Sequence, residues 1–92
     1  MKALVLIKLA SLESREAYHQ ISRLKAVTDS YMLYGRYDAA FTLQGKDLEE
    51  IHDIILVQIQ PVPGVIEILP CILVENEDPL PGQKMPSQQT TV

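Results

Sequence analysis

The sequence has few of the residues that mark several common classes of protein. It contains one cysteine, Cys71, in 92 residues, so no internal disulfide can form and no Cys-x-x-Cys metal motif is present. Eight Lys and Arg residues are outnumbered by twelve Asp and Glu residues and stand singly along the chain, so no basic stripe exists for a phosphate backbone. We therefore expect no direct nucleic-acid binding, no metal and no other cofactor.

Long apolar runs are also absent. A membrane-spanning helix needs roughly 20 apolar residues, and Lys8, Asp29, Asp38, Asp53 and Glu67 interrupt every candidate stretch. The amino terminus lacks the basic region, apolar stretch and cleavage site of a secretory signal. These features predict a water-soluble protein of the cytoplasm.

What the chain does contain is a regular apolar pattern, with 47% hydrophobic residues, enough for one small domain. Ala17, Ile21 and Leu24 recur at helical spacing, while Asp47 and Glu50 resemble a capping box at the start of a second helix. Stretches rich in Val, Ile, Leu and Tyr predict strands. The expected strands are 2–9, 27–34, 39–44 and 65–74, and the expected helices are 11–25 and 47–59.

The order of these elements, βαββαβ, predicts an α+β ferredoxin-like fold with two helices on one face of an antiparallel sheet. Pro70 cannot donate to a ladder, so strand 65–74 is expected at a sheet edge. We expect residues 1–77 to form this domain. Residues 78–92, rich in Pro, Gln, Ser and Thr, are expected to be a flexible tail.

Both faces of the predicted sheet are apolar. In the first strand Val5 and Ile7 alternate with Leu4 and Leu6, and two helices can cover only one face. The other face would leave an apolar patch on the order of a few hundred Å², more than soluble monomers usually expose. A second copy packed sheet to sheet would cover it. The expected dimer-interface residues are Leu4, Leu6, Tyr31 and Ile68.

The Gly35-Arg36-Tyr37-Asp38 turn between the second and third strands is the best candidate for ligand binding. Gly35 permits a positive φ where the chain reverses, and Asp38 can accept hydrogen bonds from a ligand amine. An Asp at a hairpin also commonly accepts bonds from its own backbone, so a structural role is the alternative.

Other reactive side chains have simpler interpretations. His19 and His52, one on each predicted helix, have no partner at metal-ligand spacing and are best interpreted as helix-surface residues. Cys71 lies within an apolar strand and is expected to be a structural thiol rather than a nucleophile.

Three segments together resemble a known family. Gly35-Arg36-Tyr37-Asp38 follows an apolar strand, Asp47-Leu48-Glu49-Glu50 opens the second helix, and Val62-Pro63-Gly64-Val65 precedes the last strand. Their order and spacing over about residues 1–75 resemble the effector domain of Lrp/AsnC transcriptional regulators, the RAM (regulation of amino-acid metabolism) domain.

This resemblance implies a dimeric αβ barrel, further assembly of dimers into rings, and an amino-acid effector bound between dimers. Family members carry an amino-terminal helix-turn-helix and this sequence starts at the first strand, so it looks like a stand-alone module that regulates transcription indirectly, together with a DNA-binding relative. The residues that the resemblance assigns to the ligand site are Gly35, Arg36, Tyr37, Asp38, Asp47 and Leu48.

One departure from the family pattern concerns the last strand, where many relatives supply two threonines that bind the effector. Ile68 and Pro70 occupy those positions here, and neither side chain can form a hydrogen bond. An effector carboxylate buried without partners would cost several kcal/mol, so the effector is bound differently, the effector is more apolar, or the site has been lost. Two other hypotheses stay open: a small cofactor-independent monooxygenase-like enzyme using His19, His52 or tyrosines, and a module that acts by assembly alone.

Overall fold

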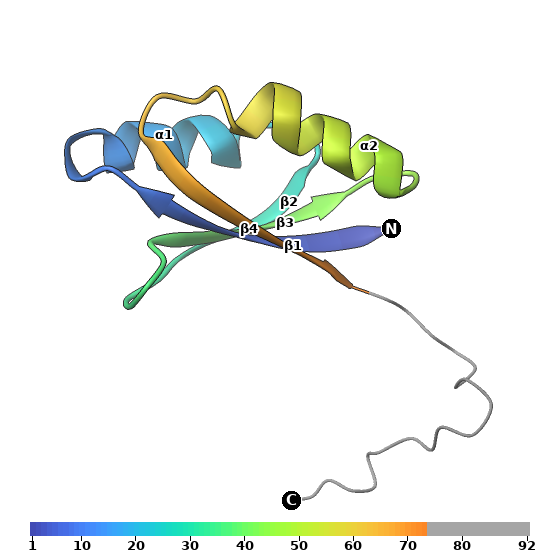
Figure 1. Ribbon diagram of the computed structural model, residues 1–92, viewed down its shortest axis with the longest axis horizontal. Coiled ribbons are helices and arrows are strands. Elements are labelled where there is room, and N and C mark those ends of the chain that lie inside the picture. The colour runs from blue at the N-terminus through green and yellow to red at the C-terminus, as the bar shows by residue number, and fades with distance from the viewer. Residues whose placement is uncertain (74–92) are drawn as a thin grey trace, which may run out of the picture.

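Four strands and two helical regions alternate along residues 1–73, the part of the chain that the computed structural model describes (Figure 1). The predicted βαββαβ order is confirmed. The end of the predicted domain at residue 77 and the predicted tail at 78–92 lie outside the described residues. The elements are β1 (Lys2–Leu9), the 3-10 helix η1 (Ser11–Glu13), α1 (Ser14–Ser22), β2 (Val27–Met32), β3 (Ala39–Gln44), α2 (Leu48–Asp53), the π-helix η2 (Ile54–Ile59) and β4 (Val65–Leu73).

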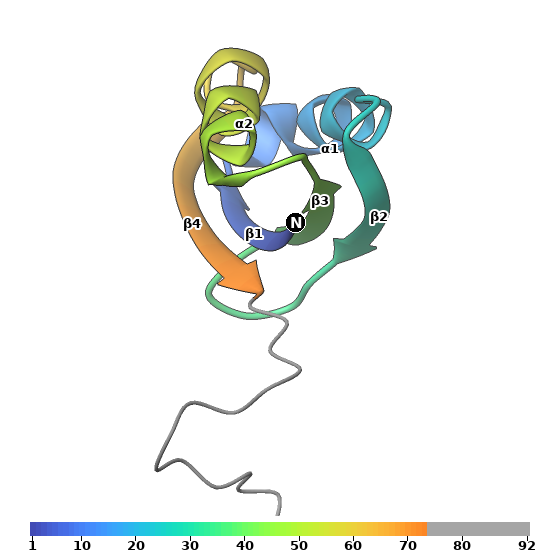
Figure 2. The same cartoon turned by 90° about the vertical axis from the view of Figure 1, so that its right-hand side faces the viewer.

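The strands form one antiparallel sheet in the order β2-β3-β1-β4. Both helical regions lie on the same face of this sheet, which leaves the other face without a helix (Figure 2). β4 is an edge strand, as Pro70 predicted, and Pro70 stands opposite Val5 of β1. The predicted ferredoxin-like fold is therefore confirmed.

The core lies between the helices and the covered face of the sheet. Alternate residues of β1 point into it, because successive side chains of a strand face opposite sides. No polar or charged residue is buried among residues 1–73. The fully buried large side chains are Val5, Ile7, Ile21, Phe41, Leu43, Ile51 and Ile59.

The first helix and the second strand are shorter than predicted. The helix starts with the 3-10 turn η1 and ends at Ser22, because the chain must turn back to enter β2 at Val27. β2 ends at Met32 instead of residue 34. The Leu33 N–H still donates across the hairpin to the Asp38 carbonyl, at 2.9 Å, but the Asp38 N–H donates to the Ile7 carbonyl of β1 rather than back to Leu33, so the pairing stops there.

The second helix begins as its sequence predicted. The Asp47 carboxylate accepts a hydrogen bond from the Glu50 N–H at 2.9 Å, which caps α2, and the Glu50 carboxylate accepts from the N–H of Lys46. From Ile54 the helix widens into the π-helix η2. No helix in residues 1–73 is long and apolar enough to cross a membrane.

Candidate functional site

The face of the sheet without a helix, which we term the open face, is apolar across its centre. Opposed residues of antiparallel strands share a face, so Tyr31, Ala40, Leu6 and Leu69 form one row across all four strands. Tyr31 is 51% exposed and Leu69 is 42% exposed. A second row on this face contains Asp29, Thr42, Leu4 and Cys71. The Thr42 hydroxyl donates to the Asp29 carboxylate at 3.0 Å, and Cys71 is half-buried.

Ile68 does not lie on the open face. The prediction that it shares an interface with Leu4, Leu6 and Tyr31 is therefore wrong. Ile68 is paired with Ile7 and packs against the core, on the side of the helices. Leu69, the next residue, points to the open face because side chains alternate along a strand.

The hairpin between β2 and β3 is tied to the end of β1. The Asp38 carboxylate accepts a hydrogen bond from the Leu9 N–H at 2.7 Å, and the Asp38 N–H donates to the Ile7 carbonyl at 2.9 Å. Gly35 has a φ of +136°, a conformation that favours glycine. Asp38 thus has a structural role, which was the alternative considered for this turn, although it binds β1 rather than its own loop.

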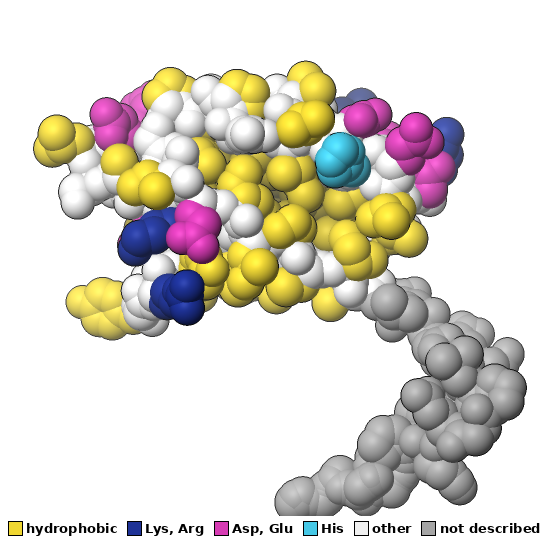
Figure 3. Space-filling model, viewed as in Figure 1, with side chains coloured by type: hydrophobic (Ala, Val, Ile, Leu, Met, Phe, Trp, Pro, Cys, Tyr) yellow, Lys and Arg dark blue, Asp and Glu magenta, His cyan; other side chains and the backbone are white. Residues whose placement is uncertain are grey.

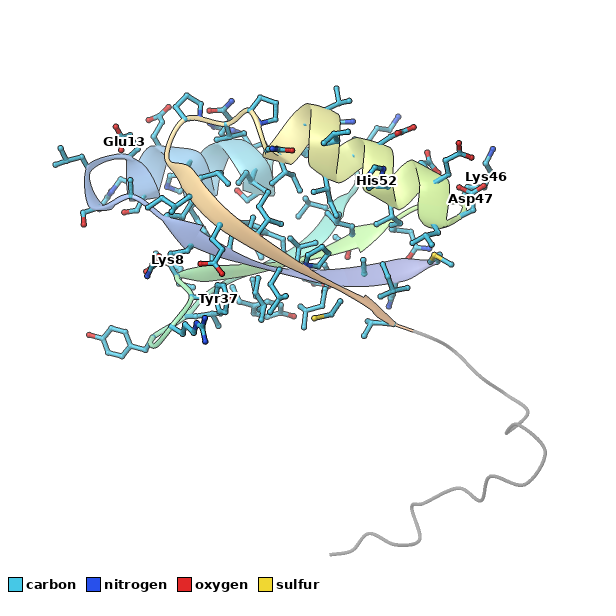
Figure 4. All side chains as sticks on the ribbon, viewed as in Figure 1. Lys8, Glu13, Tyr37, Lys46, Asp47 and His52 are labelled. Carbon is cyan, nitrogen blue, oxygen red and sulfur yellow. The ribbon has the colours of Figure 1, made fainter. Side chains whose placement is uncertain are left out.

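Two side chains of the hairpin reach neighbouring elements. The Tyr37 hydroxyl donates to the Glu67 carboxylate on β4 at 3.2 Å, and the Arg36 guanidinium lies 5.7 Å from the centre of the Tyr37 ring. The Lys8 ammonium donates to the Arg36 carbonyl at 3.4 Å. Lys8 and Tyr37 lie together at this end of the sheet (Figure 4).

The remaining predicted ligand residues, Asp47 and Leu48, lie at the opposite end of the sheet (Figure 4). The six residues of β3 separate them from Asp38, a length of about 20 Å at about 3.3 Å per residue. A single chain therefore does not bring its two groups of predicted ligand residues together.

A groove of about 530 Å³ runs between the second helical region and β4. An apolar surface is exposed there, and His52 on α2 lies beside it (Figures 3 and 4). Ile68 and Pro70 of β4 are part of its wall. The residues that line the groove are His52, Ile55, Leu56, Gln60, Val65, Ile66, Ile68 and Pro70.

The two histidines lie on separate helices, and the His19 ring is 5.7 Å from the ring of its neighbour Tyr18. Within residues 1–73, no group of three or more His, Cys, Asp or Glu side chains is placed to hold a metal ion. The groove was not predicted from the sequence, because its helical wall depends on the π-helix η2, which the apolar pattern of the sequence did not indicate.

Comparison with known proteins identifies the fold. No family model and no curated protein matches the sequence. TTHA0845 from Thermus thermophilus superposes with a TM-score of 0.77 at 25% identity, over 84% of this chain and 96% of that one. AsnC of E. coli gives a TM-score of 0.76 at 17% identity, over 84% of this chain and 52% of that one.

The transcriptional regulator NMB0573 of Neisseria meningitidis, solved as a complex with L-Met, gives a TM-score of 0.74 at 14% identity. The match covers 84% of this chain and 51% of the regulator, so the chain spans about half the length of both AsnC and NMB0573. At the level of the fold, the resemblance to the effector domains of Lrp/AsnC-type regulators is confirmed.

Proposed function

We propose that the chain is a self-associating effector domain, which binds a small molecule and regulates transcription indirectly by assembling with a DNA-binding regulator of the Lrp/AsnC type. The observation that carries this proposal is the open face of the sheet. Its central row of apolar side chains crosses all four strands and includes Leu6, Tyr31 and Leu69. Polar residues such as Lys2, Lys8 and Glu67 lie at the ends of the face, an arrangement typical of interfaces with an apolar centre and a polar rim.

A second copy on this face also explains how the predicted ligand residues can act together. The β2–β3 hairpin projects beyond the sheet on the side away from the helices (Figure 1). In a sheet-to-sheet pair this hairpin would extend toward the other subunit, and in a larger ring toward a further dimer. We propose that residues 35–38 of one copy meet Asp47 and Leu48 of another in this way, because one chain holds the two groups about 20 Å apart.

The groove between α2 and β4 supports binding of a small molecule. Its volume, about 530 Å³, falls within the range of about 300–1,000 Å³ that is usual for ligand pockets. It lies on a fold that is shared with a regulator solved as a complex with L-Met. For this chain an amino acid is the ligand that the family resemblance implies. Whether an amino acid suits the groove depends on the side chains that line it.

The proposal is tested by asking whether the chain forms a mixed oligomer with a DNA-binding regulator. The full chain would be co-expressed with a DNA-binding Lrp/AsnC-type regulator from the same genome, and the mass of the purified complex would be measured by light scattering. We expect a mixed oligomer, and we expect its affinity for the regulator's DNA site, measured by band shift, to differ from that of the regulator alone. Separate elution of the two proteins with unchanged DNA affinity would contradict the regulatory role.

A further inference from the structure

The groove between the second helical region and β4 has an unusual lining for an amino-acid site. Most of its described lining residues are aliphatic or proline, and among them only His52 and Gln60 carry polar side-chain groups. Ile66 is 60% exposed, so a ligand seated here would remove apolar surface from water.

Within residues 1–73, no charged side chain lines this groove. The acidic residues at and within α2, including Asp47, Glu49 and Asp53, surround a different depression together with Lys46. An amino acid carries an ammonium and a carboxylate, and each of them needs an opposite charge or several hydrogen bonds when it leaves water. The described lining offers neither group an opposite charge.

The described β4 wall contributes no side-chain hydrogen bonds. Val65, Ile66, Ile68 and Pro70 of this wall all have apolar side chains, and Pro70 lacks a backbone N–H as well. Hydrogen bonds from side chains to a ligand would therefore come from the helical wall, where His52 and Gln60 each provide one side chain that can donate or accept a hydrogen bond.

The helical wall has a second feature that points to ligand binding. Ile55, Leu56 and Gln60 belong to or directly follow the π-helix η2, in which the Gln60 N–H donates to the Ile55 carbonyl five residues earlier, at 2.8 Å. Single π-turns occur frequently at functional sites. Here the wider turn buries Ile59 in the core while its neighbours form the wall of the groove.

We propose that the groove binds an uncharged, mainly apolar molecule with one hydrogen-bonding group held by His52 or Gln60, and that it discriminates against zwitterionic amino acids. This inference rests on the proposed function, because the molecule bound in the groove is taken to be the effector of the proposed effector domain.

The test uses four probes that share one phenylpropyl skeleton and differ in charge: 3-phenylpropan-1-ol, 3-phenylpropanoate, 3-phenylpropylamine and phenylalanine. Each would be titrated into the full 92-residue chain while backbone amide shifts are followed by NMR. We expect the alcohol to shift amides of α2, η2 and β4 and to bind more tightly than phenylalanine by about tenfold or more, because burying unpaired charges is costly.

Two exposed residues provide a matched pair of variants. Ile66 lines the groove and is 60% exposed, whereas Val57 is 67% exposed in η2 and does not line it. We expect Ile66→Asp to weaken binding of the alcohol and to make the amine the preferred probe, because the new carboxylate can pair with the ammonium. Val57→Asp should leave the order of the four probes unchanged.

Three results would overturn the inference: phenylalanine binding more tightly than the alcohol, no probe binding at its solubility limit, or equal effects of the two variants. If Ile66→Asp only dissociates an oligomer, the groove is a contact between copies and the inference also fails. A monomeric chain that still prefers the alcohol would refute the self-association in the proposed function and leave this inference intact. An oligomeric chain that binds only phenylalanine would refute this inference and leave the self-association in the proposed function intact.

Discussion

Leu6→Asp tests whether the open face is the surface through which copies of the chain associate. Leu6 occupies the centre of the apolar row, between Ala40 of β3 and Leu69 of β4. Burying a fully exposed Leu contributes about 2 kcal/mol, and Leu6 is already half-buried in the single chain, so an interface would add about 1 kcal/mol. A two-fold symmetric dimer contains the substitution twice, so about 2 kcal/mol of apolar burial is lost, and burying the two carboxylates costs at least about 1 kcal/mol each, which makes about 4 kcal/mol in all.

A loss of about 4 kcal/mol raises the dimer dissociation constant about a thousandfold. Sedimentation velocity at micromolar concentration should therefore show a dimer or larger oligomer for the unmodified chain and a monomer for Leu6→Asp. Leu12→Asp is the matched control, because it makes the same chemical change at a side chain that is 95% exposed in η1.

Circular dichroism would establish that Leu6→Asp remains folded. If it unfolds, Leu69→Asp on the edge strand β4 replaces it, since Leu69 belongs to the same row and is 42% exposed. The claim that copies associate through the open face would be refuted by a monomeric unmodified chain. It would also be refuted by a folded Leu6→Asp or Leu69→Asp variant with an unchanged oligomeric state.

Three further predictions concern the free energy of unfolding, measured with urea. Asp38→Ala should lower it by about 1–3 kcal/mol, because the Leu9 N–H loses its charged acceptor, and an unchanged midpoint would contradict that role. Asp47→Ala should lower it by about 1 kcal/mol through loss of the helix cap, with reduced helical ellipticity as a second sign. Gly64→Ala should lower the free energy of unfolding more than Gly35→Ala. Both glycines have positive φ, so both substitutions strain the backbone. A Cβ at Gly64 would also lie 2.7 Å from a side-chain carbon of η1, whereas Gly35 faces open space. Equal effects at the two glycines would contradict this account.

Much of the fold could be predicted because local patterns and the fold agree. The alternation in β1 and the capping residues of α2 marked the correct starts of these elements, and Pro70 indicated the edge position of β4. The face of Ile68 was not predictable from hydrophobicity, because both faces of β4 are apolar. Glu67 was the available signal: its charge belongs outside the core, so alternation places Leu69 with it and Ile68 opposite.

The candidate site was predicted less well, since it depends on how the second helical region packs against β4. The π-turn that presents Ile55 and Gln60 to β4 has no clear signature in the sequence. The residues of the hairpin and of the α2 start were grouped by resemblance, and one chain holds them at opposite ends of the sheet. Their role in binding a ligand remains a prediction.

Pro70 also bears on how the chain avoids unwanted aggregation. An apolar edge strand such as β4 is a template on which further strands can add, which leads to fibrils. Pro70 near the middle of β4 has no amide hydrogen, so an added strand would lack a hydrogen bond there. Newly made chains would thus be directed away from growth along the sheet edge and toward closed assemblies that bury a face.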